Sequence, residues 1–141
     1  MSALPQLEVV EVSQGSPEWL ALRKTKVTAT DANIVMGASH WKPRIQLYHE
    51  KLSDDPPMRP TERMQRGLDL EPIARDLFNV KTGRKMKPAV IVKDWLMASL
   101  DGLDEASGAI VEIKCPGAKD HATAQQGKVP THYYPQLQHQ V

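Results

Sequence analysis

Three residues in the C-terminal half combine side-chain types and a spacing that suit phosphodiester hydrolysis. Asp101 follows an apolar run, Glu112 comes eleven residues later, and Lys114 follows after one more residue. Successive side chains of a strand alternate between its two faces, so Glu112 and Lys114 would point to the same side. If Asp101 lies beside that strand, two carboxylates and one ammonium group meet. Two hard oxygen ligands suit Mg²⁺, and a neighbouring lysine can orient a water or stabilise phosphate charge.

The elements around these three residues are short. Residues 109–111 form a β-branched run that predicts a buried strand, and Pro116 ends the strand soon after Lys114. The Asp101-Gly102 step predicts a tight turn. Taken alone, the charged residues favour an exposed polar hairpin, because acids near a Glu-x-Lys sequence are common there. Their position at the end of an apolar strand favours a functional site, because open sheets carry their functional sites at strand ends.

Two helix starts near the N-terminus carry a candidate anion site. Ser16 and Pro17 begin a helix that carries Arg23, and residues 28–31 form a second capping signal before a helix at 32–36. Hydroxyls and free amides at a helix N-terminus bind anions, and Arg23 lies a few residues upstream. Plain capping with a surface arginine is the alternative, and the local pattern alone favours it.

The longest predicted helix spans residues 61–82 and carries Glu71. Gly83 ends this helix, and apolar residues recur along it with helical spacing. Gly67, one turn before Glu71, would let another backbone or a substrate approach, whereas Pro72 predicts a kink or a restart. Glu71 is therefore either a solvated helix acid or a third active-site carboxylate, and the pattern slightly favours the first.

The remaining elements follow from turn residues and periodicity. The sequence predicts an extended lead-in at 1–13 with an edge strand at 9–12, a helix at 45–52, a mobile loop at 53–60, strands at 85–93 and 95–100, and a helix at 118–126. The last segment, residues 130–141, is rich in amides and poor in apolar side chains. It predicts a helix that faces a ligand instead of a core.

Length and composition bound the class of protein. The chain has 141 residues, so we expect a single domain over 1–141, and a formal charge of +1 means that nucleic-acid binding needs a local basic patch. The one cysteine, Cys115, excludes a disulfide framework and a cysteine-ligated cluster, and suits a reducing cytosol. The sequence has neither an apolar run of ~20 residues nor a signal-peptide pattern. It stops without a closing signal, so we expect the natural protein to continue past Val141.

Several short blocks, taken in order, resemble those of the phage-type recombination exonucleases, the lambda-exonuclease-like (YqaJ-type viral recombinase) branch of the PD-(D/E)XK nuclease superfamily. The resemblance covers residues 14–141. The blocks are Ser16-Pro17-Glu18-Trp19 with Arg23, Thr28-Ala29-Thr30, Gly67 with Leu70-Glu71-Pro72, Ser99-Leu100-Asp101-Gly102, Glu112-Ile113-Lys114-Cys115-Pro116, and Tyr133 with Gln136-Leu137-Gln138. Such an ordered set is hard to obtain by chance. Leu100 departs from the proline that the family often has, but it removes no ligand.

The resemblance implies a role for each matching residue. Asp101 and Glu112 would ligate a catalytic Mg²⁺, with Mn²⁺ as the alternative ion and the backbone carbonyl of Ile113 as a further ligand. Lys114 would position or activate the attacking water, and Glu71 would complete the metal site. The resemblance also implies a pocket for a 5′-terminal phosphate at Arg23 and Thr30, with further DNA contacts at Thr28, Ser99, Tyr133 and Gln136.

The implied fold is α/β (α+β), with a central mixed β-sheet flanked by helices and a C-terminally truncated restriction-endonuclease-like core. The implied activity is Mg²⁺-dependent 5′→3′ digestion of one strand of linear duplex DNA with 5′-phosphorylated ends. It would leave a 3′ single-stranded tail for phage-type recombination by strand annealing. The resemblance further implies a ring-shaped homotrimer, a single-strand annealing protein as partner, and a cytoplasmic location in a bacterial host or prophage context. Two alternatives stay open: a structure- or site-specific endonuclease with the same motif, and a non-catalytic DNA-binding or assembly module.

Overall fold

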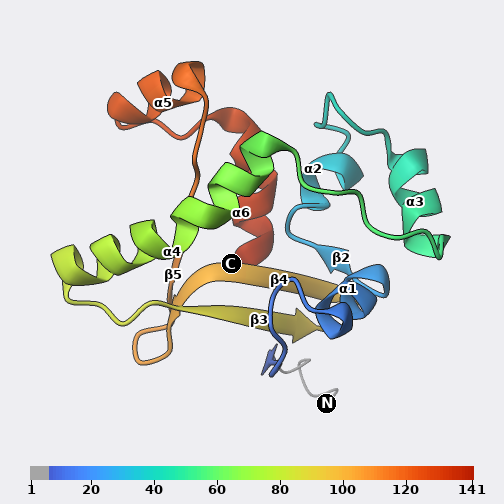
Figure 1. The fold of residues 1–141 in the computed structure, drawn as a ribbon, viewed down its shortest axis with the longest axis horizontal. Coiled ribbons are helices and arrows are strands. Elements are labelled where there is room, and N and C mark those ends of the chain that lie inside the picture. The colour runs from blue at the N-terminus through green and yellow to red at the C-terminus, as the bar shows by residue number, and fades with distance from the viewer. Residues whose placement is uncertain (1–6) are drawn as a thin grey trace, which may run out of the picture. The chain divides into compact units, whose positions relative to one another are not determined.

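The computed structural model describes residues 7–141, so the first six residues of the predicted lead-in lie outside the described part. The elements run in the order β1 (Glu8–Val9), α1 (Pro17–Lys24), β2 (Val27–Thr28), α2 (Ala32–Val35), α3 (Arg44–Leu52), α4 (Glu62–Thr82), β3 (Lys87–Lys93), β4 (Leu96–Asp104), β5 (Ala109–Val111), α5 (Ala118–Gln125), the 3₁₀ turn η1 (Thr131–Tyr133) and α6 (Tyr134–Gln140) (Figure 1).

The chain forms two compact units. The first unit contains the described residues up to Asp55 together with Val90–Ser99 and Pro130–Val141. The second unit contains Pro56–Ala89 and Leu100–Val129. The candidate anion site therefore belongs to the first unit, and the three residues of the predicted nuclease motif belong to the second.

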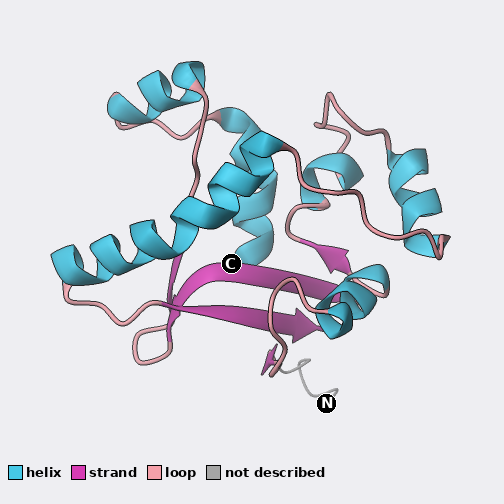
Figure 2. Cartoon of the chain, viewed as in Figure 1, coloured by secondary structure: helices cyan, strands magenta, loops and turns pink. Residues whose placement is uncertain are grey.

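The strands form a mixed sheet in the order β1-β3-β4-β2, with β5 paired to β4 (Figure 2). In the first unit, β1 pairs with β3 in antiparallel orientation, and β2 pairs with β4 in parallel, with Val27 opposite Leu96. In the second unit, β5 is antiparallel to the end of β4, with Gly102 opposite Val111. The predicted mixed sheet with flanking helices is confirmed.

The Asp101-Gly102 step does not form the predicted turn. Both residues lie inside β4, and the turn to β5 falls at residues 105–108, where Gly108 has a φ of 71°. A Cβ on Gly102 would lie 2.5 Å from Val111 Cγ1 and 2.9 Å from Met86 Cβ. The turn prediction is wrong because this glycine is needed for close packing in the second unit, not for a turn conformation.

The ends of α1 and α4 lie close to their predicted positions. The Ser16 hydroxyl accepts a hydrogen bond from Trp19 N at 3.2 Å at the start of α1, and Thr61 caps α4 in the same way through Met64 N at 3.2 Å. Gly83, with a φ of 70°, ends α4. Helix α4 continues through Pro72 without a break. No helix among the described residues is long and apolar enough to cross a membrane.

Apolar burial concentrates on β3 and β4. In the first unit the buried apolar side chains are Ala29, Ala32, Val90, Ile91, Met97 and Ala98, and in the second they are Met86 and Leu100. The terminal helix α6 is packed through its polar side: Gln136 and Gln140 are buried, and His139 Nε2 lies 3.0 Å from the Met97 carbonyl oxygen. The low apolar content of this segment had predicted a ligand-facing helix and gave no sign of this burial.

Candidate functional site

Asp101 is held at the centre of a charged cluster in the second unit. It lies in β4, and the backbone N–H of Ile113 donates a hydrogen bond to its Oδ2 at 2.7 Å. Ile113 belongs to the segment between β5 and α5, because β5 ends at Val111 and not at Lys114 as expected. The antiparallel pairing of Gly102 with Val111 brings this segment beside Asp101. The sequence thus predicted the neighbourhood correctly, although the strand stops earlier.

Several ionised groups act on the Asp101 carboxyl. Burial raises its pKa, the Ile113 N–H lowers it, the carboxylates of Glu112 and Glu71 raise it, and Lys114 lowers it. The balance raises the pKa of Asp101 to about 6. Glu112 and Glu71 therefore each lie close enough to Asp101 to repel its carboxylate, and a cation placed beside Asp101 would relieve that repulsion.

Two protein cations are already paired with these acids. Lys114 Nζ lies 2.6 Å from Glu112 Oε1, so the two side chains meet as their alternate spacing predicted. The Glu112 side chain is only 9% exposed, whereas that of Lys114 is 31% exposed and reaches solvent. Lys114 can therefore contact a ligand while Glu112 stays inside the protein.

Arg75 is a member of the cluster that the sequence gave no reason to select. It follows Glu71 by one helical turn on α4, and its Nη1 donates to Glu71 Oε1 at 2.9 Å and to the Asp101 carbonyl oxygen at 2.7 Å. The Arg75 side chain is 11% exposed. One largely buried guanidinium thus ties the helix acid to the strand that carries Asp101. The i, i+4 spacing was visible in the sequence, but the bond to β4 was not.

The oxygen atoms of this cluster are of the type that binds a hard divalent cation. It offers carboxylate oxygens from Asp101, Glu112 and Glu71, the ligand type that Mg²⁺ prefers. In the structure, Lys114 forms an ion pair with Glu112, and Arg75 forms one with Glu71. Among residues 7–141, no group of three or more His, Cys, Asp or Glu side chains is already placed to hold a metal ion. Binding of a cation would therefore require these carboxylates to turn from their present partners.

The predicted phosphate pocket lies in the first unit. Arg23 stacks over the Trp19 ring, with its Cζ 4.5 Å from the ring centroid, and its Nη2 donates to Thr30 Oγ1 at 3.4 Å. The Thr30 hydroxyl lies 3.1 Å from that of Thr28. Burial lowers the pKa of Arg23, and the charge of Asp31 opposes this effect. A guanidinium and two hydroxyls are thus gathered as an anion site requires.

Ser99 reaches this group through Trp19. The indole Nε1 donates to Ser99 Oγ at 2.9 Å, so the serine fixes the ring on which Arg23 stacks. The other two predicted DNA contacts lie at the end of the same unit. The Tyr133 ring packs against His132 with centroids 4.2 Å apart, and Gln136 is buried in α6.

The sequence suggested that Asp31 caps α2 with its side chain, but in the structure it does not. Its side chain makes no capping hydrogen bond; Oδ2 instead accepts from Thr28 N at 2.9 Å and pairs with Lys51 Nζ at 2.7 Å. Lys51 also donates to the Arg23 carbonyl oxygen at 2.7 Å. Burial would raise the pKa of Asp31, but the hydrogen bonds from Lys51 and Thr28 hold it below its usual value. This buried pair supports the loop that carries Thr30, and the separation of its partners in sequence hid it.

Replacing Asp31 with asparagine is expected to lower the free energy of unfolding at neutral pH by about 1–3 kcal/mol, because a buried charged hydrogen-bond network is lost. Because the native pKa of Asp31 is lowered, the carboxylate stabilises the fold above the unfolded-state pKa. That contribution disappears as the pH falls below about 4. Urea unfolding of both proteins between pH 8 and pH 3 measures the difference.

The control for this prediction is Glu50→Gln, which breaks the ion pair between Lys42 Nζ and Glu50 Oε2, 2.6 Å apart. The Glu50 side chain is 45% exposed, so this change is expected to cost about 0.5 kcal/mol or less. A loss in Asp31→Asn that stays constant down to pH 3 would contradict an electrostatic role for Asp31.

Comparisons with known proteins agree on one family. The model of the YqaJ-like viral recombinase domain matches residues 18–141. The uncharacterised protein YqaJ of Bacillus subtilis strain 168 is 27% identical over 128 residues, which is 86% of this chain and 40% of that protein. The crystal structure of LHK-Exo, an alkaline exonuclease from Laribacter hongkongensis, matches with a TM-score of 0.72 and 31% identity over 89% of this chain and 66% of that one. Its complex with dAMP matches with a TM-score of 0.71 at 31% identity, over 88% and 66% of the two chains. The chain thus spans less than two thirds of the length of these relatives.

Proposed function

Because this chain belongs to the YqaJ-like viral recombinase domain family, we propose that it is a metal-dependent deoxyribonuclease that digests linear duplex DNA from its 5′ ends. The observation that carries the proposal is the convergence of Asp101, Glu112, Glu71 and Lys114 in the second unit. The 31% identity to an alkaline exonuclease supports the same reaction class. Digestion of one strand 5′→3′ would leave a 3′ tail, the substrate of strand annealing in recombination.

The carboxylates would hold the metal ion. Asp101, Glu112 and Glu71 supply its oxygen ligands, with the Ile113 carbonyl as a further one, and the proposed ion is Mg²⁺ with Mn²⁺ as the alternative. When bound, such an ion polarises the scissile phosphate and stabilises the charge that develops on its oxygens. The pKa of Asp101, about 6 without metal, leaves its carboxylate ionised above neutral pH and therefore able to bind.

Lys114 and the first unit would act on the DNA itself. Lys114 Nζ is partly exposed and 2.6 Å from Glu112, so it can donate a hydrogen bond to the attacking water or to a phosphate oxygen. Arg23 and the hydroxyls of Thr30 and Thr28 would bind the 5′-terminal phosphate, and Ser99 would keep Trp19 in place beneath Arg23. Contacts of Tyr133 and Gln136 with the digested strand belong to the same proposal, as do a homotrimer and a single-strand annealing partner.

A timed digest tests this function. A 5′-phosphorylated linear duplex and a supercoiled circle are incubated with the protein, with Mg²⁺ or with EDTA. We expect the linear duplex to disappear only with Mg²⁺, the circle to survive, and a label on the 5′ end to be released before one on the 3′ end. Cutting of both substrates at similar rates would favour the endonuclease alternative. DNA binding without any nucleotide release would favour the non-catalytic module.

A further inference from the structure

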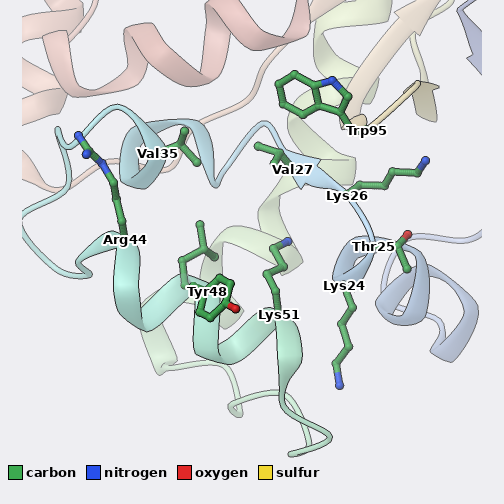
Figure 3. A pocket seen from close by; sticks show the side chains of 10 residues that line it. Lys24, Thr25, Lys26, Val27, Val35, Arg44, Tyr48, Lys51 and Trp95 are labelled. Carbon is green, nitrogen blue, oxygen red and sulfur yellow. The ribbon is translucent and has the colours of Figure 1, made fainter.

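A cavity of about 310 Å³ opens in the first unit, and none of the residues that line it is proposed above for catalysis or phosphate binding (Figure 3). It lies between the end of α1, β2 and α3, with Trp95, in the turn directly before β4, on its border. Val27, Val35 and Leu47 give it apolar walls. Its volume falls at the lower end of the range of small-molecule sites in proteins, which suits one nucleotide-sized group.

Two aromatic rings border this cavity and are open to solvent. Tyr48 is 59% exposed and Trp95 is 64% exposed, although both are large and could bury most of their surface in a core. Figure 3 shows the Tyr48 ring on α3 and the Trp95 indole on the opposite side of the cavity. Rings placed in this way offer their faces to a flat ligand, and nucleobases stack on such faces whatever their identity.

The charged side chains on the border are all cationic. Lys24, Lys26, Arg44 and Lys51 line the cavity, and no acidic residue does so. Lys51 is neutralised by Asp31, but Lys24 and Lys26 donate to the backbone carbonyls of Ser53 and Asp94 and so keep their full charge. Within the described part of the chain, no carboxylate lies within ion-pair distance of Lys24, Lys26 or Arg44. A chain whose formal charge is only +1 therefore concentrates positive charge here.

We propose that this cavity binds an unpaired nucleotide of single-stranded DNA, with the base against Tyr48 and Trp95 and the flanking phosphates on Lys24, Lys26 and Arg44. Cations that follow a backbone, combined with stacking rings, form the usual binding surface for single-stranded nucleic acid. An acidic peptide would satisfy the cations but would leave both rings without a flat partner. The proposal goes beyond hydrolysis and needs no metal ion, so it can fail or hold independently of the nuclease proposal.

Binding of a fluorescent oligothymidine to the full chain in EDTA tests the rings. Tyr48→Ala and Trp95→Ala are each expected to raise the Kd by about 5- to 30-fold, because the bound base loses one of its two stacking partners in each case. The matched control is Trp41→Ala, since Trp41 is 94% exposed in the same unit and does not line the cavity. It should change the Kd less than twofold. An unchanged Kd in both cavity variants, or an equal loss in the control, would overturn the proposal.

The cations are tested by salt dependence. Replacing Lys24 and Lys26 together by glutamine should make the plot of log K against log salt less steep by about 1.4, or about 0.7 for each phosphate that is no longer neutralised. The pair Lys81→Gln and Lys128→Gln, two exposed lysines of the second unit, removes the same charge elsewhere. An equal change of slope in this control would show that only net charge matters, and would contradict the site.

A spectroscopic measurement keeps the test valid if an alanine variant folds poorly. Bound oligonucleotide should quench tryptophan fluorescence by stacking on Trp95. The quenching should be lost in Trp95→Phe, while the affinity is largely kept because the phenyl ring still stacks. Trp41→Phe should retain the quenching. Competition by an acidic peptide together with quenching that is unaffected by Trp95→Phe would assign the cavity to a protein partner and overturn the proposal.

Discussion

The Asp101→Asn variant is expected to release nucleotides from duplex DNA at least about 10³-fold more slowly than the unaltered protein, while its metal-free form unfolds at a higher temperature. Activity would fall because asparagine carries no charge to hold the proposed divalent ion at the scissile phosphate. Stability rises because the substitution removes a carboxylate whose charge is disfavoured by burial and, to a smaller extent, by Glu112 and Glu71. A single change would thus move activity and stability in opposite directions.

The stability part of this prediction depends on pH. The native pKa of Asp101 is raised to about 6 from 3.8, so the charged form is disfavoured in the folded state. The resulting penalty is fully present above about pH 7, shrinks as the pH falls through 6, and is absent below about pH 4, where the carboxyl is protonated in both states. A shift of about two units corresponds to about 3 kcal/mol at most. Solvent screening around a half-buried group reduces the expected gain to about 1–2 kcal/mol.

Thermal unfolding in EDTA at pH 8, 6 and 4 measures this gain beside the nuclease assay. The Ile113 N–H can still donate to the asparagine oxygen, so the fold of the segment after β5 should be kept. Asp76→Asn is the matched control, because Asp76 is an exposed acid of α4 in the same unit. It should change neither activity nor melting temperature. A destabilised Asp101→Asn protein at pH 8 would show that burial and the neighbouring acids do not disfavour the ionised Asp101 carboxylate in the absence of metal.

Local chemistry made much of the fold predictable from the sequence. Ser16 and Thr61 cap their helices because a short hydroxyl side chain reaches the free amide three residues later in any context. Gly83 ends α4 because it adopts a positive φ without strain. Ile110 and Val111 of β5 are β-branched, which suits a pleated strand, and the strand is completed by its pairing with β4. The helix ends, in contrast, depend on neighbours in the chain and not on the tertiary fold.

The errors arose where a residue's role depends on distant partners. Gly102 carries a turn signal, but Val111 and Met86 leave no room for a side chain, and only the packed sheet reveals this. Asp31 has the composition of a cap, yet Lys51, twenty residues later, takes its carboxylate. Arg75 looks like half of a surface ion pair until the Asp101 carbonyl is placed beside it. Type and spacing thus brought Asp101, Glu112 and Lys114 together in the prediction, whereas the Arg75 and Lys51 partners of Glu71 and Asp31 could not be found in this way.

Arg23→Ala is expected to slow digestion of a 5′-phosphorylated linear duplex by about 10- to 150-fold, because charge-assisted hydrogen bonds to the terminal phosphate are lost. The same variant should digest a 5′-hydroxyl duplex at nearly the unaltered rate, so the preference for a phosphorylated end disappears. The rate of Arg23→Lys on the phosphorylated duplex should lie between those of the unaltered protein and Arg23→Ala. Lysine keeps the charge but cannot reproduce the planar group that stacks 4.5 Å over Trp19 and reaches Thr30. Arg84→Ala, which removes an exposed arginine of the second unit, serves as the control. Equal losses on phosphorylated and hydroxyl ends would mean that Arg23 supports the fold or general DNA binding, and recognition of the 5′-phosphate would then have to come from other residues.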